Sequence, residues 1–457
     1  MGETLETINS AVNSLVWGPP FLILLMGTGA YLTYRIGFFQ FRHLGLAWKY
    51  SFGRLFRKTK EAETGSISSF GAVASAMAAT IGVGNIAGVS TAIALGGPGA
   101  VFWMWLSALV GMATKFGEAS LGVKYRKVEA DGSISGGVFH YIENGLGQKW
   151  KWLAVLYAFL AGIAALGIGN MVQANTMADS LSVGFNVPPA VTGVIAMILV
   201  GLVILGGIQR IAKAAVRLVP FMATVYVIGA LLVILLNITQ LPAVIGDIFY
   251  YAFNPHAATG GFAGAAVAAS IRYGIARGVF SNEAGLGAAS IVHAQAKNTP
   301  ARQGMWGIWE VFIDTIVVGS MTAFAILITG VLDTGETGQA LASQAFATGL
   351  PAIGSEIVLV GIVLFSYTTM LTWSFYGEKS WEYIFGTKVV LPYRLVFIAF
   401  LLIGAVGGLE FIWSLADTLN GLMAAPNLIA LIALAGVLAK EKKSFMLGLK
   451  EGREKLE

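Results

Sequence analysis

Two glycine-interrupted stretches decide the fold of this chain: TIGVGNIAGVSTAIALGGPG at residues 80–99 and RYGIARGVFSNEAGLGAA at residues 272–289. Both lie inside long apolar runs. Each glycine costs a helix about 1 kcal/mol relative to alanine, so such clusters mark places where a helix can unwind. Close helix packing through small residues is the alternative interpretation, and it has most weight for Gly84 and Gly88.

The composition around these stretches is that of a membrane protein. The chain has 457 residues, of which 56% are hydrophobic and 12% charged, and its mean hydropathy is +0.75. The charged fraction is about half of the usual quarter, and a water-soluble fold of this size needs more polar surface. We therefore predict an all-α integral membrane protein.

Runs of about 20 apolar residues are long enough to cross a bilayer as helices. Eleven such runs are present, and the first is expected to remain as a span because no basic residue precedes it, as a signal peptide would require. They cover residues 12–36, 69–96, 98–124, 151–181, 189–208, 212–238, 258–286, 303–332, 355–384, 390–408 and 411–438.

Lysine and arginine are distributed unevenly over the connecting loops. Alternate loops and the C-terminal tail hold them, for example at Arg42, Arg126 and Lys443, whereas the opposite set of loops holds none. Since cytoplasmic loops carry the excess of basic residues, we expect the N-terminus outside and the C-terminus inside the cell membrane. The basic loops are not expected to bind nucleic acid, because topology explains them. The mixed aromatic and basic segment 48–60 is expected to be an amphipathic anchor in the inner interface.

The two glycine-rich stretches are five spans apart, so they run in opposite directions through the membrane. Such a pair is typical of a secondary transporter built from inverted repeats, with its ligand held at the breaks. We predict an extra N-terminal helix and amphipathic segment in 1–68, five-helix repeats in 69–238 and 239–438, and a basic tail in 439–457.

Polar side chains in the spans are the candidate ligands. An unwound turn at Ile81 to Gly84 would expose N–H groups for a carboxylate and carbonyls for a hard cation such as Na⁺. Span nine supplies the hydroxyls of Thr368 and Thr369, and span four supplies the amides of Asn170 and Gln173. A lone membrane threonine often bonds only its own helix, which is the plainer interpretation of these hydroxyls.

Ionisable residues inside spans are functional candidates by default. Lys115 and Glu118 are expected to form a local pair, and Glu310 and Asp314 are like charges spaced i, i+4. The roles of Asp314 and Asp417 are left open. Four scattered histidines, no cysteine and no P-loop argue against a metal enzyme and ATP hydrolysis.

Four stretches of the chain form specific motifs: TIGVGNIAGVSTAIALGGPGAVFWMW (80–105), GMATKFGEASLGVKYR (111–126), RYGIARGVFSNEAGLGAA (272–289) and NGLMAAPNLIAL (420–431). These motifs resemble those of the alanine or glycine:cation symporter family, which is similar in architecture to the leucine-transporter (LeuT-like) fold. The resemblance covers residues 15–438.

This resemblance implies sodium-coupled, or in some members proton-coupled, uptake of alanine and glycine, with Na⁺ as coupling ion and no other cofactor. It implies a single sodium site, because span seven lacks the threonine that usually accompanies a second. The implied sodium ligands are Ala78, Ile81, Thr368 and Thr369. The implied substrate site comprises Thr80, Gly82, Val83, Gly84, Asn85, Asn170, Gln173, Tyr273, Gly274, Thr369 and Trp373, with Trp373 as the wall of the side-chain pocket.

The protein is expected to work as a monomer by alternating access. A channel is the first rival and a membrane-embedded enzyme the second. The two inverted breaks in one chain argue against a channel, and the lack of a convincing nucleophile and base argues against an enzyme.

Overall fold

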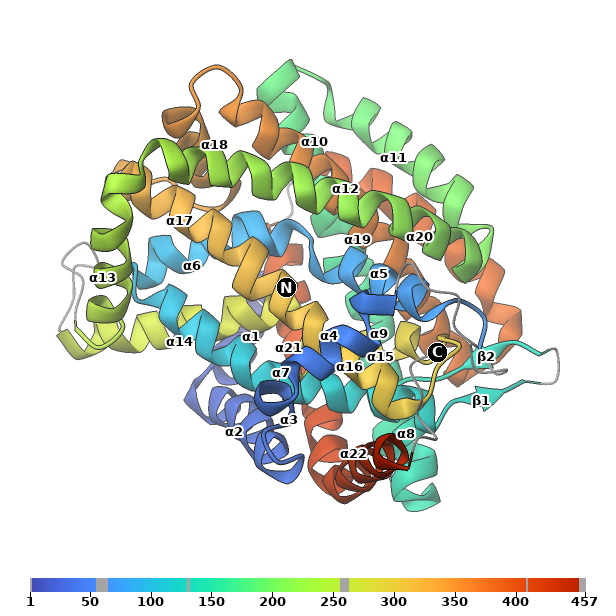
Figure 1. Cartoon of the computed structure of the whole chain (residues 1–457). Coiled ribbons are helices and arrows are strands. Elements are labelled where there is room, and N and C mark those ends of the chain that lie inside the picture. Colours follow the sequence, from blue (N-terminus) through green and yellow to red (C-terminus); the bar gives the residue numbers. More distant parts are fainter. Residues whose placement is uncertain (1, 55–64, 130–131, 255–262, 408–409, 452–457) are drawn as a thin grey trace.

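The structure is a computed structural model of the whole chain, and it describes residues 2–54, 65–129, 132–254, 263–407 and 410–451 (Figure 1). Helices dominate, and the two strands form one short antiparallel hairpin. The elements of the N-terminal half are α1 (Gly2–Val16), α2 (Pro19–Arg35), α3 (Phe39–Arg42), α4 (Leu44–Tyr50), α5 (Ser69–Thr80), α6 (Val89–Gly96), α7 (Ala100–Lys124), β1 (Lys127–Val128), β2 (Ile134–Ser135), α8 (Val138–Tyr141), α9 (Lys151–Leu166), α10 (Val172–Phe185), α11 (Pro189–Ile204) and α12 (Gly207–Leu236).

The C-terminal half continues as a second series of helices. They are α13 (Leu241–Tyr251), α14 (Ala263–Asn282), α15 (Ala289–His293), α16 (Pro300–Val311), α17 (Ser320–Thr329), α18 (Gly338–Gly349), α19 (Gly354–Phe385), α20 (Val390–Val406), α21 (Glu410–Ala433) and α22 (Ala435–Lys450).

The helices confirm a multi-pass membrane protein. Among the described residues, 8 helices are long and apolar enough to cross a membrane, or 9 if the bent pair of α5 with residues 84–96 forms one span. The shorter α11 and the 20-residue α14 occupy two further predicted spans. The count of eleven therefore stays a prediction. The predicted amphipathic segment 48–60 is described only as far as Arg54, and the remainder lies outside the described residues.

The first predicted break is present. The Ser68 hydroxyl caps the start of α5 by accepting from the Gly71 N–H at 3.0 Å. The helix ends at Thr80, and the chain resumes as a π-helical turn, η2 (Gly84–Gly88). The angle between α5 and the helical segment Gly84–Gly96 is 49°. The Asn85 Oδ1 atom accepts from the Gly82 N–H at 3.1 Å. The same N–H also donates to the Thr80 carbonyl at 2.8 Å, so a side chain and a tight backbone turn together satisfy a group that the interrupted helix leaves unpaired.

The second break lies at the last two of the four glycines in its stretch. Gly274 and Gly278 stay inside α14, and the helix unwinds only after Asn282. A Cβ at Gly274 would lie 2.4 Å from the Ala100 carbonyl oxygen, so this glycine serves close packing against α7. The place of Tyr273 and Gly274 in the substrate site stays a prediction. The break uses Gly285 at φ +103° and Gly287 at φ +82°, which only glycine adopts readily.

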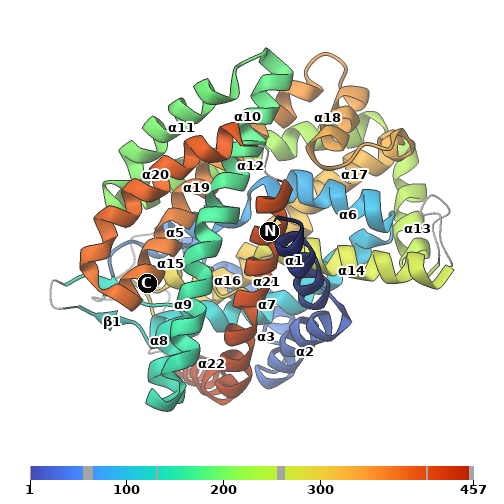
Figure 2. The same ribbon diagram turned by 180° about the vertical axis from the view of Figure 1, so that it is seen from behind.

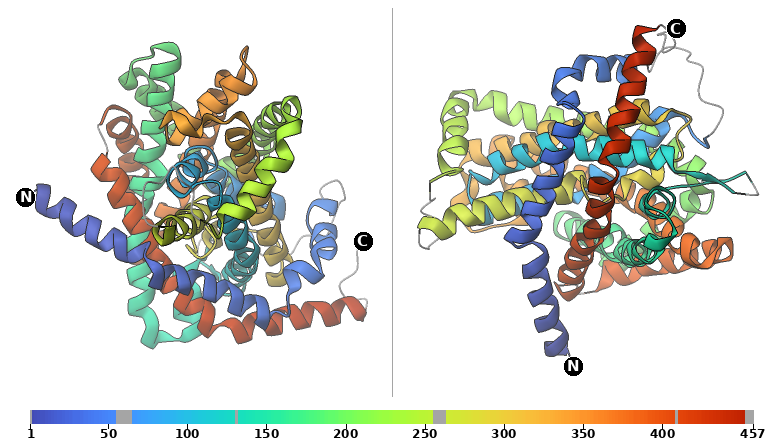
Figure 3. Two further views of the ribbon diagram at one scale, coloured as in Figure 1. Left: turned by 90° about the vertical axis from the view of Figure 1, so that its left-hand side faces the viewer. Right: turned by 90° about the horizontal axis from the view of Figure 1, so that it is seen from below.

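The helices pack as two groups that lie against each other. In one group α7 packs against α14, α16 and α15, and α14 packs against α6; in the other α19 packs against α9 and α10, and α20 against α10 and α11. Figures 1 and 2 show these groups from the two faces, with α1 beside α21 in Figure 2. Figure 3 shows that α1 begins on one side of the molecule and α22 ends on the other. The repeat boundaries stay predictions.

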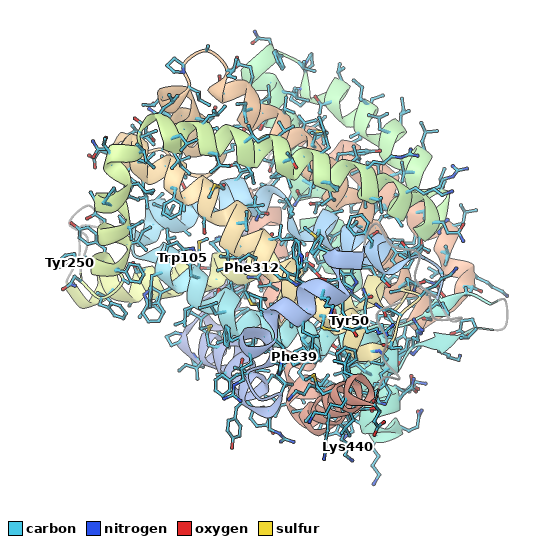
Figure 4. The ribbon with its side chains drawn as sticks, in the orientation of Figure 1. Phe39, Tyr50, Trp105, Tyr250, Phe312 and Lys440 are labelled. Carbon is cyan, nitrogen blue, oxygen red and sulfur yellow. The ribbon has the colours of Figure 1, made fainter. Side chains whose placement is uncertain are left out.

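The surface of the bundle is rich in exposed apolar side chains, which suits contact with lipid. Figure 4 shows Tyr250 of α13 at the periphery, where 59% of it is exposed. Leu202 and Leu235 are exposed on α11 and α12. The interior, by contrast, contains fully buried polar groups such as Lys115, and several of these groups lie beside the two helix breaks.

Candidate binding site at two helix breaks

The two breaks lie against each other. A Cβ at Gly84 would lie 3.2 Å from Phe280 Cδ1 and 3.3 Å from Ser281 Cα. The side chain of Asp314, on the π-helical turn η8 (Phe312–Gly319), joins them. Its Oδ1 accepts from Asn85 Nδ2 at 2.9 Å and its Oδ2 accepts from the Ser281 hydroxyl at 2.9 Å. Asp314, whose role the sequence left open, thus ties the first break to the second.

The helix α19 approaches the first break through Thr369. Its hydroxyl donates to the Ala78 carbonyl at 3.1 Å and lies 3.3 Å from the Ala79 carbonyl oxygen. A Cβ at Gly82 would lie 2.6 Å from Thr369 Oγ1, so glycine permits this approach. The structure therefore brings Ala78, Gly82 and Thr369 together.

Thr368 is directed elsewhere. Its hydroxyl lies 3.1 Å from each of the Leu364 and Phe365 carbonyl oxygens of its own helix and 3.4 Å from Met222 Sδ on α12. Such bonds to the preceding turn are what a membrane threonine makes when it holds no ligand. The two adjacent threonines, which the sequence treats as a pair, thus face different neighbours.

Trp373 also lies at the second break. Its Nε1 donates to Glu283 Oε1 at 2.9 Å. A Cβ at Gly169 would lie 2.2 Å from Trp373 Cβ, so span four has a glycine where the indole passes. Glu283 itself has a left-handed backbone (φ +56°), which a residue other than glycine rarely adopts and which is common at functional sites.

The amides of span four are used within the protein. Asn170 Nδ2 donates to the Phe397 carbonyl of α20 at 2.6 Å, so it is engaged outside the two breaks. Gln173 Nε2 donates to the Ile168 carbonyl at 3.0 Å, while Gln173 Oε1 and the Thr80 hydroxyl are buried and have no hydrogen-bonding partner among the described residues. The sequence pattern placed Asn170 and Gln173 on one face, but the structure assigns them different neighbours.

Two cavities lead toward the breaks from the side of the loops that lack basic residues. One, of about 440 Å³, is lined by Val83 and Phe280, and the other, of about 610 Å³, by Tyr273 and Asp417. Both include Arg277, whose Nη1 lies 3.5 Å from Asp417 Oδ1. The predicted site residues Val83 and Tyr273 therefore border open space.

The opposite, basic side is closed by backbone pairing. Ile67, just before α5, forms a parallel bridge with Ala296, and the Ser66 N–H donates to the Gln295 carbonyl at 2.8 Å. Arg126 Nη1 donates to the Ala296 carbonyl at 2.6 Å. Cavities therefore border the breaks on one side, and on the other side backbone pairing joins the residues before α5 to those after α15.

Buried charged side chains lie beside the second break and stabilise it. Lys115 pairs with Glu310 of α16 at 3.0 Å, so the prediction of a local pair between Lys115 and Glu118 is wrong. Glu118 Oε1 instead accepts from the N–H groups of Gly285 at 2.8 Å and Gly287 at 3.1 Å. On a helix, residues three apart share a face. Here, however, Lys115 pairs with Glu310 and Glu118 binds the N–H groups of the second break, so each side chain uses a partner on another element.

The partners of Glu310 and Asp314 also differ from the sequence expectation of two like charges that repel each other. His293 Nε2 lies 2.8 Å from Glu310 Oε2, and Asp314 receives its donors from Asn85, Ser281 and Thr315. Sequence reasoning missed the roles of Glu118, Ser281 and Glu283, although all three stand inside the quoted motifs.

The atoms around the first break suit a hard, weakly bound cation. The Thr369 hydroxyl and the Ala78 and Ala79 carbonyl oxygens lie together there, and oxygens of these kinds are what such a cation prefers. In the part of the chain that the structure describes, no cluster of three or more His, Cys, Asp or Glu could hold a metal ion.

The chain is similar to one known protein family, to several sequence relatives and to solved structures. The model of the sodium:alanine symporter family matches residues 2–457. The chain is 48% identical to an uncharacterized transporter of Haemophilus influenzae, covering 98% of this chain and 97% of that protein. It is 47% identical to the sodium/alanine symporter AgcS of Methanococcus maripaludis, covering 95% of this chain and 96% of that protein. Among solved structures, the crystal structure of MhsT in complex with L-phenylalanine is similar with a TM-score of 0.58 at 12% identity, covering 84% of this chain and 99% of that one.

Proposed function

The chain belongs to the sodium:alanine symporter family and has a LeuT-like transporter fold, and from this premise we propose that it couples the uptake of alanine or glycine to the entry of Na⁺. It is a multi-pass membrane transporter and not an enzyme. The relative from Methanococcus maripaludis is named a sodium/alanine symporter, which supports this substrate and this ion.

One observation carries the proposal: the contact of Thr369 with the carbonyl end of α5. The hydroxyl lies within 3.1 Å of the Ala78 carbonyl oxygen, directly before the unwound turn. Entry of Na⁺ between these oxygens would replace the hydroxyl hydrogen bond and link α19 to α5. Because α5 and α19 pack directly against each other, a cation there would strengthen the contact between these two helices.

The turn after Thr80 is the proposed binding place for the substrate carboxylate. The N–H groups at Val83 and Gly84 begin the turn η2, and the positive end of a helical segment favours an anion. The cavity bordered by Val83 leads to this point. Ile81, Gly82 and Asn85 would complete the turn, with Trp373 as one wall of the pocket.

The backbone pairing on the basic side supports alternating access. Release of the ligands requires the bridge between Ile67 and Ala296 to open while the cavity at Val83 closes. Coupling further requires that Na⁺ and substrate each strengthen the binding of the other, since linkage is reciprocal. We propose that the protein does this as a monomer in the cell membrane, with its N-terminus outside and its basic loops in the cytoplasm.

Uptake of labelled alanine into proteoliposomes tests the function. We expect accumulation with an inward Na⁺ gradient and none with K⁺ in its place. A proton-coupled transporter is the second candidate, because Asp314 is a buried carboxylate at the contact of the two breaks. An inward proton gradient without Na⁺ would then drive uptake. Equal uptake with and without either gradient would reject both forms of coupling.

The Thr369→Ala variant is expected to raise the Na⁺ concentration for half-maximal alanine uptake by roughly 10-fold, since one buried oxygen ligand is worth about 1–3 kcal/mol. Thr368→Ala is the matched control, because its hydroxyl already bonds its own helix. We expect a change of less than about 3-fold there. Sodium titration of uptake measures both. Equal effects of the two variants would contradict the assignment of Thr369.

A further inference from the structure

We propose that Glu283 is the counter-charge that binds the ammonium group of the transported amino acid. The inference rests on the proposed amino-acid symport and adds to it the residue that would recognise the amine. It is carried by the burial of Glu283, by its incomplete set of partners and by its position at the second break.

Glu283 is a buried carboxylate with one oxygen unused. Only 3% of the residue is exposed. Its Oε1 accepts from Trp373 Nε1 at 2.9 Å, but its Oε2 has no hydrogen-bonding partner among the described residues. An ionised carboxylate buried without a counter-charge costs several kcal/mol. Such a group therefore calls for a cation or a proton that arrives with the ligands.

The neighbouring acids already have their partners. Glu310 pairs with Lys115 at 3.0 Å. Asp314 accepts from Asn85, Ser281 and Thr315. The Oε2 atom of Glu118 is also without a partner, but its Oε1 receives three N–H donors, from Gly285, Gly287 and Asn427.

The charges near the breaks are unbalanced toward the acids. Lys115 is buried beside these acids and is occupied by Glu310, while Arg277, which lines both cavities, pairs with Asp417. Glu283 accepts only the indole N–H of Trp373, so its negative charge has the fewest compensating partners among these acids. The incoming zwitterion supplies the missing positive charge.

The position of Glu283 suits a role in recognition. It lies three residues beyond Phe280, which lines the cavity that leads in from outside, and Phe280 in turn lies against Gly84 of the first break. A substrate whose carboxylate meets the turn at Val83 and Gly84 would thus extend its ammonium toward the second break. Trp373 orients the Glu283 carboxylate through one oxygen and leaves the other free.

The left-handed backbone at Glu283 supports the same conclusion. A residue other than glycine at φ +56° costs of order 1–3 kcal/mol, and such strain persists mainly at functional sites. Glycine follows at Gly285 and Gly287, where the chain needs still larger positive φ values. A charged side chain in this strained position is therefore informative about what the break binds.

The experiment measures binding of L-alanine and of L-lactate, which has a hydroxyl in place of the ammonium group. Ligand-induced thermal stabilisation of the purified protein in saturating Na⁺ yields both affinities. For the unaltered protein we expect alanine to bind at least about 100-fold more tightly than lactate. A difference of less than about 3-fold would overturn the proposal without any variant.

Glu283→Gln keeps the shape and removes the charge. We expect it to weaken alanine binding by at least about 30-fold and lactate binding by less than about 3-fold. Retention of alanine affinity, or an equal loss for both ligands, would overturn the proposal. Glu283→Asp, which keeps the charge, should retain a clear preference for alanine, and it serves if the glutamine variant does not fold. Glu336→Gln, on an exposed loop, is the control for removing a carboxylate.

Failure of this inference is distinct from failure of the proposed function. Sodium-driven alanine uptake by the unaltered protein reports the function on its own. If that uptake is present and Glu283→Gln binds alanine as the unaltered protein does, the symport stands and the role of Glu283 falls. If the unaltered protein neither binds nor accumulates alanine, the symport of alanine is what fails.

Discussion

Replacing Lys115 with methionine is expected to destabilise the folded protein by about 3–5 kcal/mol, because it leaves the Glu310 carboxylate buried without its cation. Both side chains are fully buried, and their charged atoms lie 3.0 Å apart. Methionine fills a similar volume, so the loss of charge rather than a cavity dominates. The variant should show a clear fall in the midpoint of thermal unfolding of the purified protein.

A double variant separates the charge from the packing. Lys115→Met combined with Glu310→Gln removes both charges, and we expect it to recover most of the lost stability, since a buried pair is worth far less than the cost of breaking it. The matched surface control is Lys127→Met. Lys127 pairs with Glu129 at 3.0 Å, but 60% of its side chain is exposed, so the change should be below about 1 kcal/mol. Equal effects at Lys115 and Lys127 would show that burial does not matter.

Replacing Gly287 with alanine is expected to abolish most transport, to below about a tenth of the unaltered rate, because two costs add at this position. Its φ of +82° is unfavourable for a side chain, and a Cβ would lie 2.4 Å from Val138 Cγ2 and 2.9 Å from Asn427 Cγ. Asn427 and the Gly287 N–H both bind Glu118. The extra methyl group would therefore displace the contacts that hold the second break in place.

Gly147→Ala is the control that isolates crowding from backbone strain. Gly147 has φ +98°, but a Cβ there would meet open space. We expect this variant to retain more than about half of the uptake rate, since only the conformational cost remains. Initial rates of alanine uptake, corrected for the amount of protein in the liposomes, compare the two. Equal losses would mean that strain alone is sensed and that the packing around Gly287 is unimportant.

Much of the fold was predictable from local patterns. Apolar runs predicted the spans, and the glycines around Asn85 predicted the first break at its observed position. The glycine cluster of residues 272–289 predicted the second break, but not which of its glycines form it. A glycine that permits unwinding and a glycine that permits close packing look the same in a sequence. Only the approach of α7 to Gly274 tells them apart.

The candidate site was predictable in its residue types but not in its contacts. Thr369 reaches Ala78 as the resemblance implies, whereas the adjacent Thr368 faces Met222. Asn170 is engaged by α20. Adjacent residues on a helix point in directions that differ by roughly 100°. Whether two adjacent side chains face the same ligand therefore depends on how the neighbouring helices pack around them.

The membrane environment, the helical class, the first break and the family resemblance were all predictable, because each depends on composition or on neighbouring residues. Tertiary packing pairs Lys115 with Glu310, brings Glu118 to the second break and leaves Glu283 Oε2 without a hydrogen-bonding partner in the described part of the chain. These partners lie on different helices, far apart in the chain. Their meeting depends on how each helix is rotated and packed, which no local pattern specifies.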